Sequence, residues 1–156
     1  MNPSPRAANS AGKTQRDFVS FDLTTARRML PLVKTIVSDI RAGHGSLEQL
    51  APEQDRLDRN RRALTWAERD RRYQITEEIR KTEKNLTLAA TELDELGIAL
   101  VDSRVGSVDF PTRINGRSAA FSWRHDEETV AFWHYQGEGQ RRPVPAEWVA
   151  PSANRV

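Results

Sequence analysis

The segment LDELGIALVD, residues 93–102, separates two hydrophobic patterns in this chain of 156 residues. Before Gly97, apolar residues recur every three or four positions, which is the period of a helix. After Gly97 they form short runs with the alternation of strands. Glycine commonly ends helices because it adopts a left-handed backbone without a Cβ clash. The sequence therefore predicts an α+β fold: a long antiparallel, coiled-coil-like helical hairpin over 17–97, then a small antiparallel β-sheet subdomain of three to four strands over 98–149.

Two apolar stripes define the arms of this hairpin. The first follows Asp22, a favourable N-cap because its carboxylate accepts free amides of the first helical turn. It consists of Leu23, Ala26, Leu30, Val33, Val37 and Ile40. The second stripe consists of Ile75, Ile79, Thr82, Leu86, Ala89, Leu93 and Leu96. Both repeat about every 3.5 residues, so the two stripes are expected to face each other.

The position of the hairpin tip has two interpretations. The sequence AGHGS at 42–46 has the composition of a break between helices, which would place the tip within 43–52. Against this, leucines continue the first stripe beyond the glycines. Thr65 and Glu68 also have the spacing of a capping box, in which each side chain binds the other's free amide. We prefer a tip at 60–66, with the first helix interrupted around the two glycines of AGHGS.

Composition limits the classes of function. The chain has no cysteine, which excludes disulfides, thiolate metal sites and cysteine nucleophiles. Its formal net charge is only +2, and the basic residues of 1–16 account for it. We expect a disordered tail at 1–16, without the apolar centre of a signal peptide, and a C-terminal tail at 150–156. No run has the roughly 20 apolar residues of a membrane span, so a cytoplasmic protein without membrane contact is predicted.

The segment FSWRHDEETVAFWHYQ, residues 121–136, carries two of the four tryptophans. A turn centred on Asp126 and Glu127 would make it a β-hairpin whose successive side chains alternate between two faces. The face expected to pack on the helices holds Phe121, Trp123, Val130, Phe132 and His134. The opposite face is expected to hold Ser122, Arg124, Ala131, Trp133 and Tyr135. That second face is either a stacking platform for an anionic group or a surface covered by the chain around Trp148, and we favour the cover.

Signals of catalysis and metal binding are weak. His134 with Asp109 and Glu127 is a candidate metal or acid–base cluster, but the chain lacks the H-x-x-x-H and H-E-x-x-H spacings. No serine lies in a G-x-S-x-G elbow, and no glycine-rich phosphate loop is present. We therefore assign no catalytic residue, no metal and no cofactor, and we favour a non-enzymatic protein over an enzyme.

An arginine-rich segment covers the predicted tip. Residues 56–72, RLDRNRRALTWAERDRR, contain seven arginines against three acids. The favoured interpretation is a solvated helical end whose arginines pair with Asp58, Glu68 and Asp70. The alternative is a surface for nucleic-acid phosphates, an acidic protein or anionic lipid. The candidate residues for that alternative are Arg61, Arg62, Arg69 and Arg71.

Several motifs resemble a bacterial family catalogued as domain of unknown function 2203. They are LTTARRMLPLV near the start, LDELGIALVD in the middle, and VGSVDFPTRINGR followed by FSWRHDEETVAFWH. The chain departs from the family pattern with Ser122 where cysteine is usual and Asp126 where glycine is usual. The resemblance implies no function. It implies that the positions to test are Asp109, Trp123, Arg124, Glu127, Trp133, His134 and Arg141.

A buried polar network would explain those positions. In it, Glu127 or Asp109 holds Arg124, and His134 bonds to a carboxylate, so that charge-assisted hydrogen bonds lock the strands onto the helix ends.

Three functions follow, in order of preference. The first is a non-enzymatic interaction or scaffold protein acting through the hairpin, with a protein partner or a second copy as in a homodimer. Its contacts would be exposed heptad residues such as Leu47, Leu57 and Leu64. The second is a small anionic ligand-binding module or enzyme using Arg124, Trp133, His134 and Arg141. The third, least favoured, is nucleic-acid binding through the arginine-rich tip.

Overall fold

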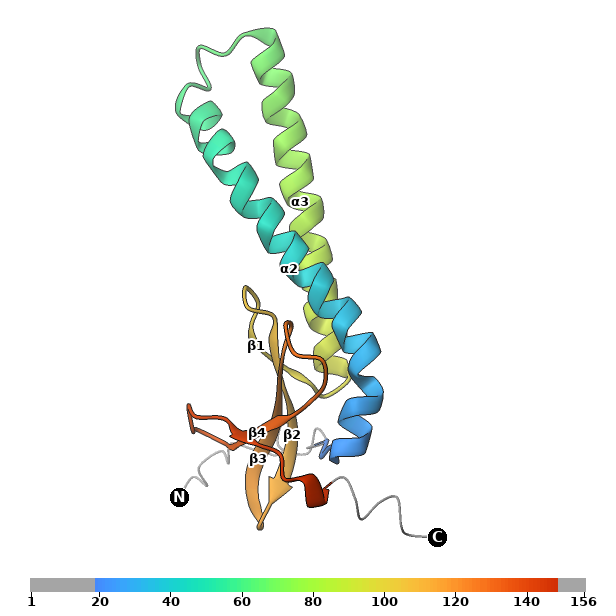
Figure 1. Ribbon diagram of the computed structural model, residues 1–156. Coiled ribbons are helices and arrows are strands. Elements are labelled where there is room, and N and C mark those ends of the chain that lie inside the picture. The colour runs from blue at the N-terminus through green and yellow to red at the C-terminus, as the bar shows by residue number, and fades with distance from the viewer. Residues whose placement is uncertain (1–18, 149–156) are drawn as a thin grey trace, which may run out of the picture.

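A computed structural model describes residues 19–148 of the chain. Helices α2 (Leu23–Arg59) and α3 (Trp66–Glu95) form a long antiparallel hairpin. They are followed by β1 (Ala99–Asp102), β2 (Ser107–Ile114), β3 (Arg117–Arg124), β4 (Phe132–Tyr135), β5 (Arg142–Pro143) and the short 3-10 helix η1 (Ala146–Trp148). Figure 1 shows the hairpin projecting away from the sheet. The predicted α+β fold is confirmed, whereas the tails predicted at 1–16 and 150–156 lie outside the described residues.

Helix α2 begins at the predicted cap and runs without a break. Asp22 Oδ1 accepts the amide of Thr25 at 2.6 Å, and all six residues of the predicted stripe are buried. The predicted interruption around Gly43 and Gly45 is wrong, because α2 continues through both. A Cβ on Gly43 would lie 2.7 Å from Leu86 Cδ2 of α3. Glycine here lets the two helices approach closely, so it marks a packing contact and not a turn.

The hairpin turns between Arg59 and Trp66, at the tip preferred from the sequence. Thr65 Oγ1 accepts the amide of Glu68 at 3.2 Å, and Glu68 Oε1 accepts the amide of Thr65 at 3.1 Å. This is the predicted capping box. It satisfies two of the amides that the first turn of α3 leaves free, and so fixes where that helix begins.

A small core of its own supports the turn. Leu57, Leu64 and Ile75 pack together there, separate from the main core. Leu57 is 1 % exposed and Leu64 is 8 % exposed, while Leu47 is half-buried. The prediction that Leu57 and Leu64 are exposed and available to a partner is therefore wrong. Their apolar surface is used within the hairpin itself, because both helices reach far enough to bury it.

Helix α3 ends in a Schellman motif at the predicted glycine. Gly97 has a φ of 82°, and its amide donates to Asp94 O, while the amide of Ile98 donates to Leu93 O, both at 3.0 Å. Ile98 and Leu93 are buried in the main core, which is the apolar contact that accompanies this motif. The motif therefore ends α3 and leads the chain directly into β1.

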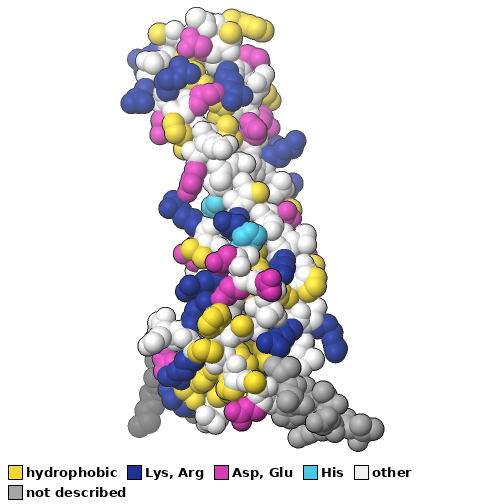
Figure 2. All heavy atoms as spheres, viewed as in Figure 1, with side chains coloured by type: hydrophobic (Ala, Val, Ile, Leu, Met, Phe, Trp, Pro, Cys, Tyr) yellow, Lys and Arg dark blue, Asp and Glu magenta, His cyan; other side chains and the backbone are white. Residues whose placement is uncertain are grey.

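The sheet is an antiparallel meander in the order β1-β2-β3-β4-β5. The two-residue β5 makes five strands, one more than the upper number expected. Asn115 and Gly116 have φ values of 54° and 73°, as a tight hairpin turn between β2 and β3 requires. On the face shown in Figure 2, hydrophobic side chains gather over the sheet end of the molecule, and charged side chains of both signs surround the tip.

The pairing of β3 with β4 differs by one residue from the prediction. Phe121 pairs with Trp133 and not with Phe132, because residues 125–131 form a loop longer than the expected turn. A shift of one residue exchanges the faces of a strand. The core face therefore carries Trp133 and Tyr135, and the opposite face carries Phe132 and His134.

Trp148 closes the core from the C-terminal side. Its ring centroid lies 5.4 Å from that of Trp133 and 6.4 Å from that of Phe121. Trp133 is 8 % exposed, so the open stacking platform considered from the sequence is wrong. Trp148 packs on Trp133 as the cover interpretation expected, but it does so at the core face of the sheet.

Candidate functional site

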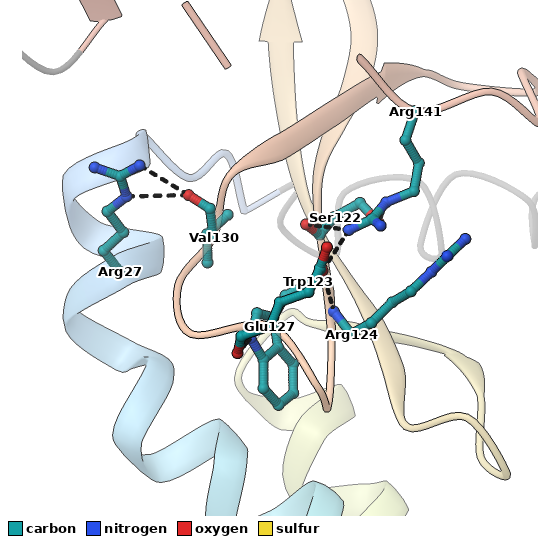
Figure 3. A network of polar contacts seen from close by, with 7 residues as sticks. All are labelled: Arg27, Ser122, Trp123, Arg124, Glu127, Val130 and Arg141. Atoms are coloured by element: carbon teal, nitrogen blue, oxygen red, sulfur yellow. Dashed lines mark hydrogen bonds and ion pairs between the residues drawn. The ribbon is translucent and has the colours of Figure 1, made fainter. Parts of the chain in front are cut away.

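Glu127 lies at the centre of a polar network beside the sheet (Figure 3). Its Oε1 accepts the backbone amide of Arg124 at 2.7 Å and Nη2 of Arg141 at 2.5 Å. The side chain of Arg124 points away from Glu127 in Figure 3. Glu127 therefore holds Arg124, as predicted, but through the backbone amide and not through the guanidinium. The guanidinium that pairs with Glu127 is that of Arg141, which is more distant in sequence.

This network holds the 125–131 loop against the sheet and helix. Arg141 Nε donates to Ser122 Oγ at 2.9 Å, and a hydroxyl oxygen is a stronger acceptor than a thiol sulfur at this position would be. Trp123 Nε1 donates to Glu127 O at 3.0 Å. From α2, Arg27 donates twice to Val130 O, at 2.9 and 3.0 Å. Apart from the Arg124 guanidinium, which points away, the polar groups joined by dashed lines in Figure 3 bond to one another, and these bonds explain how the loop is fixed.

His134 forms a second polar group on the face opposite the core. Its Nε2 lies 2.9 Å from Asp109 Oδ2, and its Nδ1 lies 2.9 Å from Tyr135 O. Only a protonated imidazole donates to both oxygens, since the neutral ring has one N–H. Burial alone would lower the pKa of His134, but the hydrogen bonds to the Tyr135 carbonyl and to Asp109 outweigh it and raise that pKa. With both nitrogens occupied, the ring offers no free lone pair to a proton or a metal ion.

The cavity beside this pair is small. Asp109 and His134 line a space of about 260 Å³, below the roughly 300 Å³ at which ligand pockets usually begin. Trp133 lies on the other face, and Arg141 is engaged with Glu127. The structure therefore does not bring Arg124, Trp133, His134 and Arg141 together into one site. Within residues 19–148, no group of three or more side chains is placed to hold a metal ion.

The tip of the hairpin presents aromatic residues to solvent. Trp66 is 78 % exposed and Tyr73 is 67 % exposed. Because Trp66, Arg69 and Tyr73 are three and four residues apart on α3, their side chains follow one another along a single helix face. Sequence reasoning noted Trp66 but missed Tyr73. Its spacing of seven residues from Trp66, off the buried stripe, was the available signal.

Four of the seven arginines of residues 56–72 have a partner for the side chain. Arg72 pairs with Asp58 at 2.7 Å and Arg56 with Glu68 at 3.9 Å, as the solvated-end interpretation expected. Arg71 pairs instead with Glu53 at 2.6 Å, and Arg59 Nε donates to Asp55 O at 3.3 Å. The remaining three are Arg61, Arg62 and Arg69. Their side chains are exposed and have no hydrogen bond or ion pair with any residue of the described part of the chain. We call Arg61, Arg62, Trp66, Arg69 and Tyr73 the tip patch.

Comparison with known proteins identifies the family. A family model described as an uncharacterized conserved protein, DUF2203, matches residues 20–144. The chain belongs to the DUF2203 family. No curated protein matches this chain, and no solved structure does.

The two candidate regions of this DUF2203 protein differ in character. In the sheet, the polar residues matched to the family pattern bond mainly to one another. In the tip patch, the two aromatic rings and the three arginines have no hydrogen bond, ion pair or ring contact within residues 19–148. Neither α2 nor α3, nor any other helix in residues 19–148, combines the length and hydropathy that crossing a membrane requires. The tip patch is therefore the candidate functional site.

Proposed function

We propose that this DUF2203 protein is a cytoplasmic, non-enzymatic interaction module whose helical arm binds an acidic protein surface through the tip patch. The observation that carries the proposal is the exposure of Trp66 and Tyr73 on one helix face together with three arginines that lack partners in the described residues. A large aromatic side chain left in water forgoes on the order of 2 kcal/mol of burial free energy. A partner that covers both rings recovers that energy.

The chemistry of the tip patch suits a protein partner. Trp, Tyr and Arg are the residue types that dominate binding energy at protein interfaces, where a single one contributes about 2 kcal/mol or more. The capping box at Thr65 and Glu68 holds the start of α3 in place, so the patch is presented with little loss of freedom on binding. The unpaired guanidiniums select for carboxylates on the partner.

The charge distribution argues against nucleic acid and against a second copy of the chain as the partner. Acidic residues are interspersed with the tip arginines, at Asp58, Glu68 and Asp70, whereas nucleic-acid surfaces are continuous basic stripes. A second copy docked tip to tip would bring identical arginines together, because a two-fold interface contacts itself. An acidic protein surface needs no continuous basic stripe and places no like charges against the tip arginines.

The experiment compares capture by three forms of the chain. The double variant Trp66→Ala with Tyr73→Ala removes the aromatic surface. The matched control is Leu88→Ala, an apolar residue of the same helix that is 59 % exposed outside the patch. Each form is used to capture proteins from a cell lysate. We then purify the proteins that wild type and control enrich but the double variant does not, and calorimetry measures their affinity for each form.

The purified partner is expected to bind the double variant and Arg69→Ala at least about tenfold more weakly than wild type, which corresponds to about 1.4 kcal/mol for each change. Raising the salt concentration should weaken the wild-type complex. A partner that binds all forms equally rejects the proposal. Capture that is abolished by nuclease identifies nucleic acid as the occupant and rejects it as well.

A further inference from the structure

A groove of about 580 Å³ lies where α2 passes the turn between β1 and β2. The side chains that matter are Arg41, His44 and Glu48 of α2, Arg104 of the turn and His125 after β3, with Gly45 at the helix surface. Figure 2 shows histidine side chains beside basic ones between the two ends of the molecule. The groove is remote from the tip patch and does not depend on the proposed function.

Gly45 has no packing reason to be glycine. It lies inside α2, where glycine weakens a helix. A Cβ at this position would meet no atom within 4 Å, in contrast to Gly43, whose Cβ would collide with Leu86. Gly45 lines the groove, so a larger side chain at this position would occupy part of that space.

The walls of the groove are cationic and held in place. Arg41 Nε donates to Arg104 O at 3.2 Å, which fixes the guanidinium beside the turn. Gly106 packs so closely that a Cβ there would lie 2.7 Å from Arg41 Cδ and 3.0 Å from His125 Cβ. His125 Nδ1 is shielded from solvent and has no partner in residues 19–148.

One carboxylate opposes this charge. Glu48 Oε1 lies 3.0 Å from Arg104 Nη2, with the two side chains 58 % and 78 % exposed. An ion pair so open to water contributes little, and an anion in the groove can replace it. Two guanidiniums and two imidazoles therefore face the groove against a single acid.

We infer that this groove binds a small phosphate ester. Guanidinium forks match the oxygens of a phosphate group and bond to them in pairs. The volume falls within the roughly 300–1,000 Å³ of small-molecule pockets, so it accommodates more than a free phosphate ion. The organic part of the ligand lies along Ala42 and Gly45, the small side of the groove.

The three histidines of the chain provide the test, since His44 and His125 line the groove and His134 lies elsewhere. Ribose 5-phosphate is titrated into the full chain while the imidazole signals are followed by NMR, with ribose as the neutral control. Saturable shifts of the His44 and His125 signals are expected, without a shift of His134 and without any response to ribose. Signals are assigned from single His→Gln variants.

Variants of the groove distinguish binding at this specific site from the non-specific attraction of anions to a positively charged protein. The double change Arg41→Gln with Arg104→Gln removes the forks, and Gly45→Leu fills the space while improving the helix. Each should weaken binding at least about tenfold. Arg80→Gln removes one positive charge from α3 outside the groove, where Arg80 pairs with Glu77 at 3.1 Å, and should leave the affinity unchanged.

Three results overturn the inference: no saturable shift at millimolar ribose 5-phosphate, a shift of His134 equal to the others, or undiminished affinity in both groove variants. Because Gly45→Leu and the arginine variant perturb the protein differently, a folding defect in one leaves the other as a valid test.

Discussion

Replacing Gly45 with alanine is expected to stabilise the protein, whereas the same change at Gly43 is expected not to. Glycine inside a helix costs about 1 kcal/mol relative to alanine because it loses more backbone freedom on folding. At Gly45 the new Cβ meets no atom within 4 Å, so the free energy of unfolding should rise by about 1 kcal/mol. At Gly43 the Cβ would lie 2.7 Å from Leu86 Cδ2 and 3.0 Å from Leu86 Cγ, and the repacking this forces should offset the gain.

The two variants form a matched pair, because the same change from glycine to alanine is made at two positions that lie two residues apart in one helix. Urea unfolding followed by circular dichroism gives the free energy of unfolding of each. For a chain of this length a change of 1 kcal/mol moves Tm by about 2–4 °C, which melting curves resolve. The reasoning is refuted if Gly45→Ala gains less than about 0.5 kcal/mol. It is equally refuted if Gly43→Ala gains as much as Gly45→Ala.

Three further predictions concern the junction and the sheet. Glu127→Gln and Arg141→Gln should each cost about 2 kcal/mol, since each removes the counter-charge of a charged side chain that is only 14–17 % exposed. Additive losses in the double variant would contradict direct pairing. Because the pKa of His134 is raised in the folded state, its protonation stabilises the protein fully below the ordinary pKa of 6.5, and this stabilisation is lost as pH rises through the folded-state pKa. The urea midpoint of the wild type should therefore fall as pH rises over that range. If the midpoint of His134→Gln falls equally with pH, His134 is not the cause. Gly97→Ala should cost about 2 kcal/mol, because it places a Cβ at a φ of 82° and 2.9 Å from Val19. Thermal melting curves measure this loss. The control is Gly139→Ala, whose Cβ would meet no atom within 4 Å.

The features predicted correctly are those that neighbouring residues determine. The Asp22 cap, the capping box of Thr65 and Glu68 and the stop at Gly97 each depend on groups within about four residues of one another. The α2 stripe was predictable for the same reason, because a helix repeats its environment at a fixed spacing.

The features missed depend on residues far apart in the sequence. The glycines of AGHGS suggested a break, but Gly43 is explained by Leu86, which only the folded hairpin brings near. The register of β3 with β4 depends on a loop that Glu127 and Arg141 hold together, and no local turn signal reports that pair. For the candidate site, sequence indicated the arginines of the tip but not which of them remain unpaired.

The presence of two separate cores has a consequence for motion. The cluster of Leu57, Leu64 and Ile75 is not continuous with the main core, so the outer part of the hairpin can open while the sheet and the lower helices stay intact. Hydrogen exchange of the backbone amides should then be faster in the parts of α2 and α3 near the tip than in the parts near the sheet. Unfolding that starts at the end of the arm would then stop before the main core, and the sheet would keep its structure.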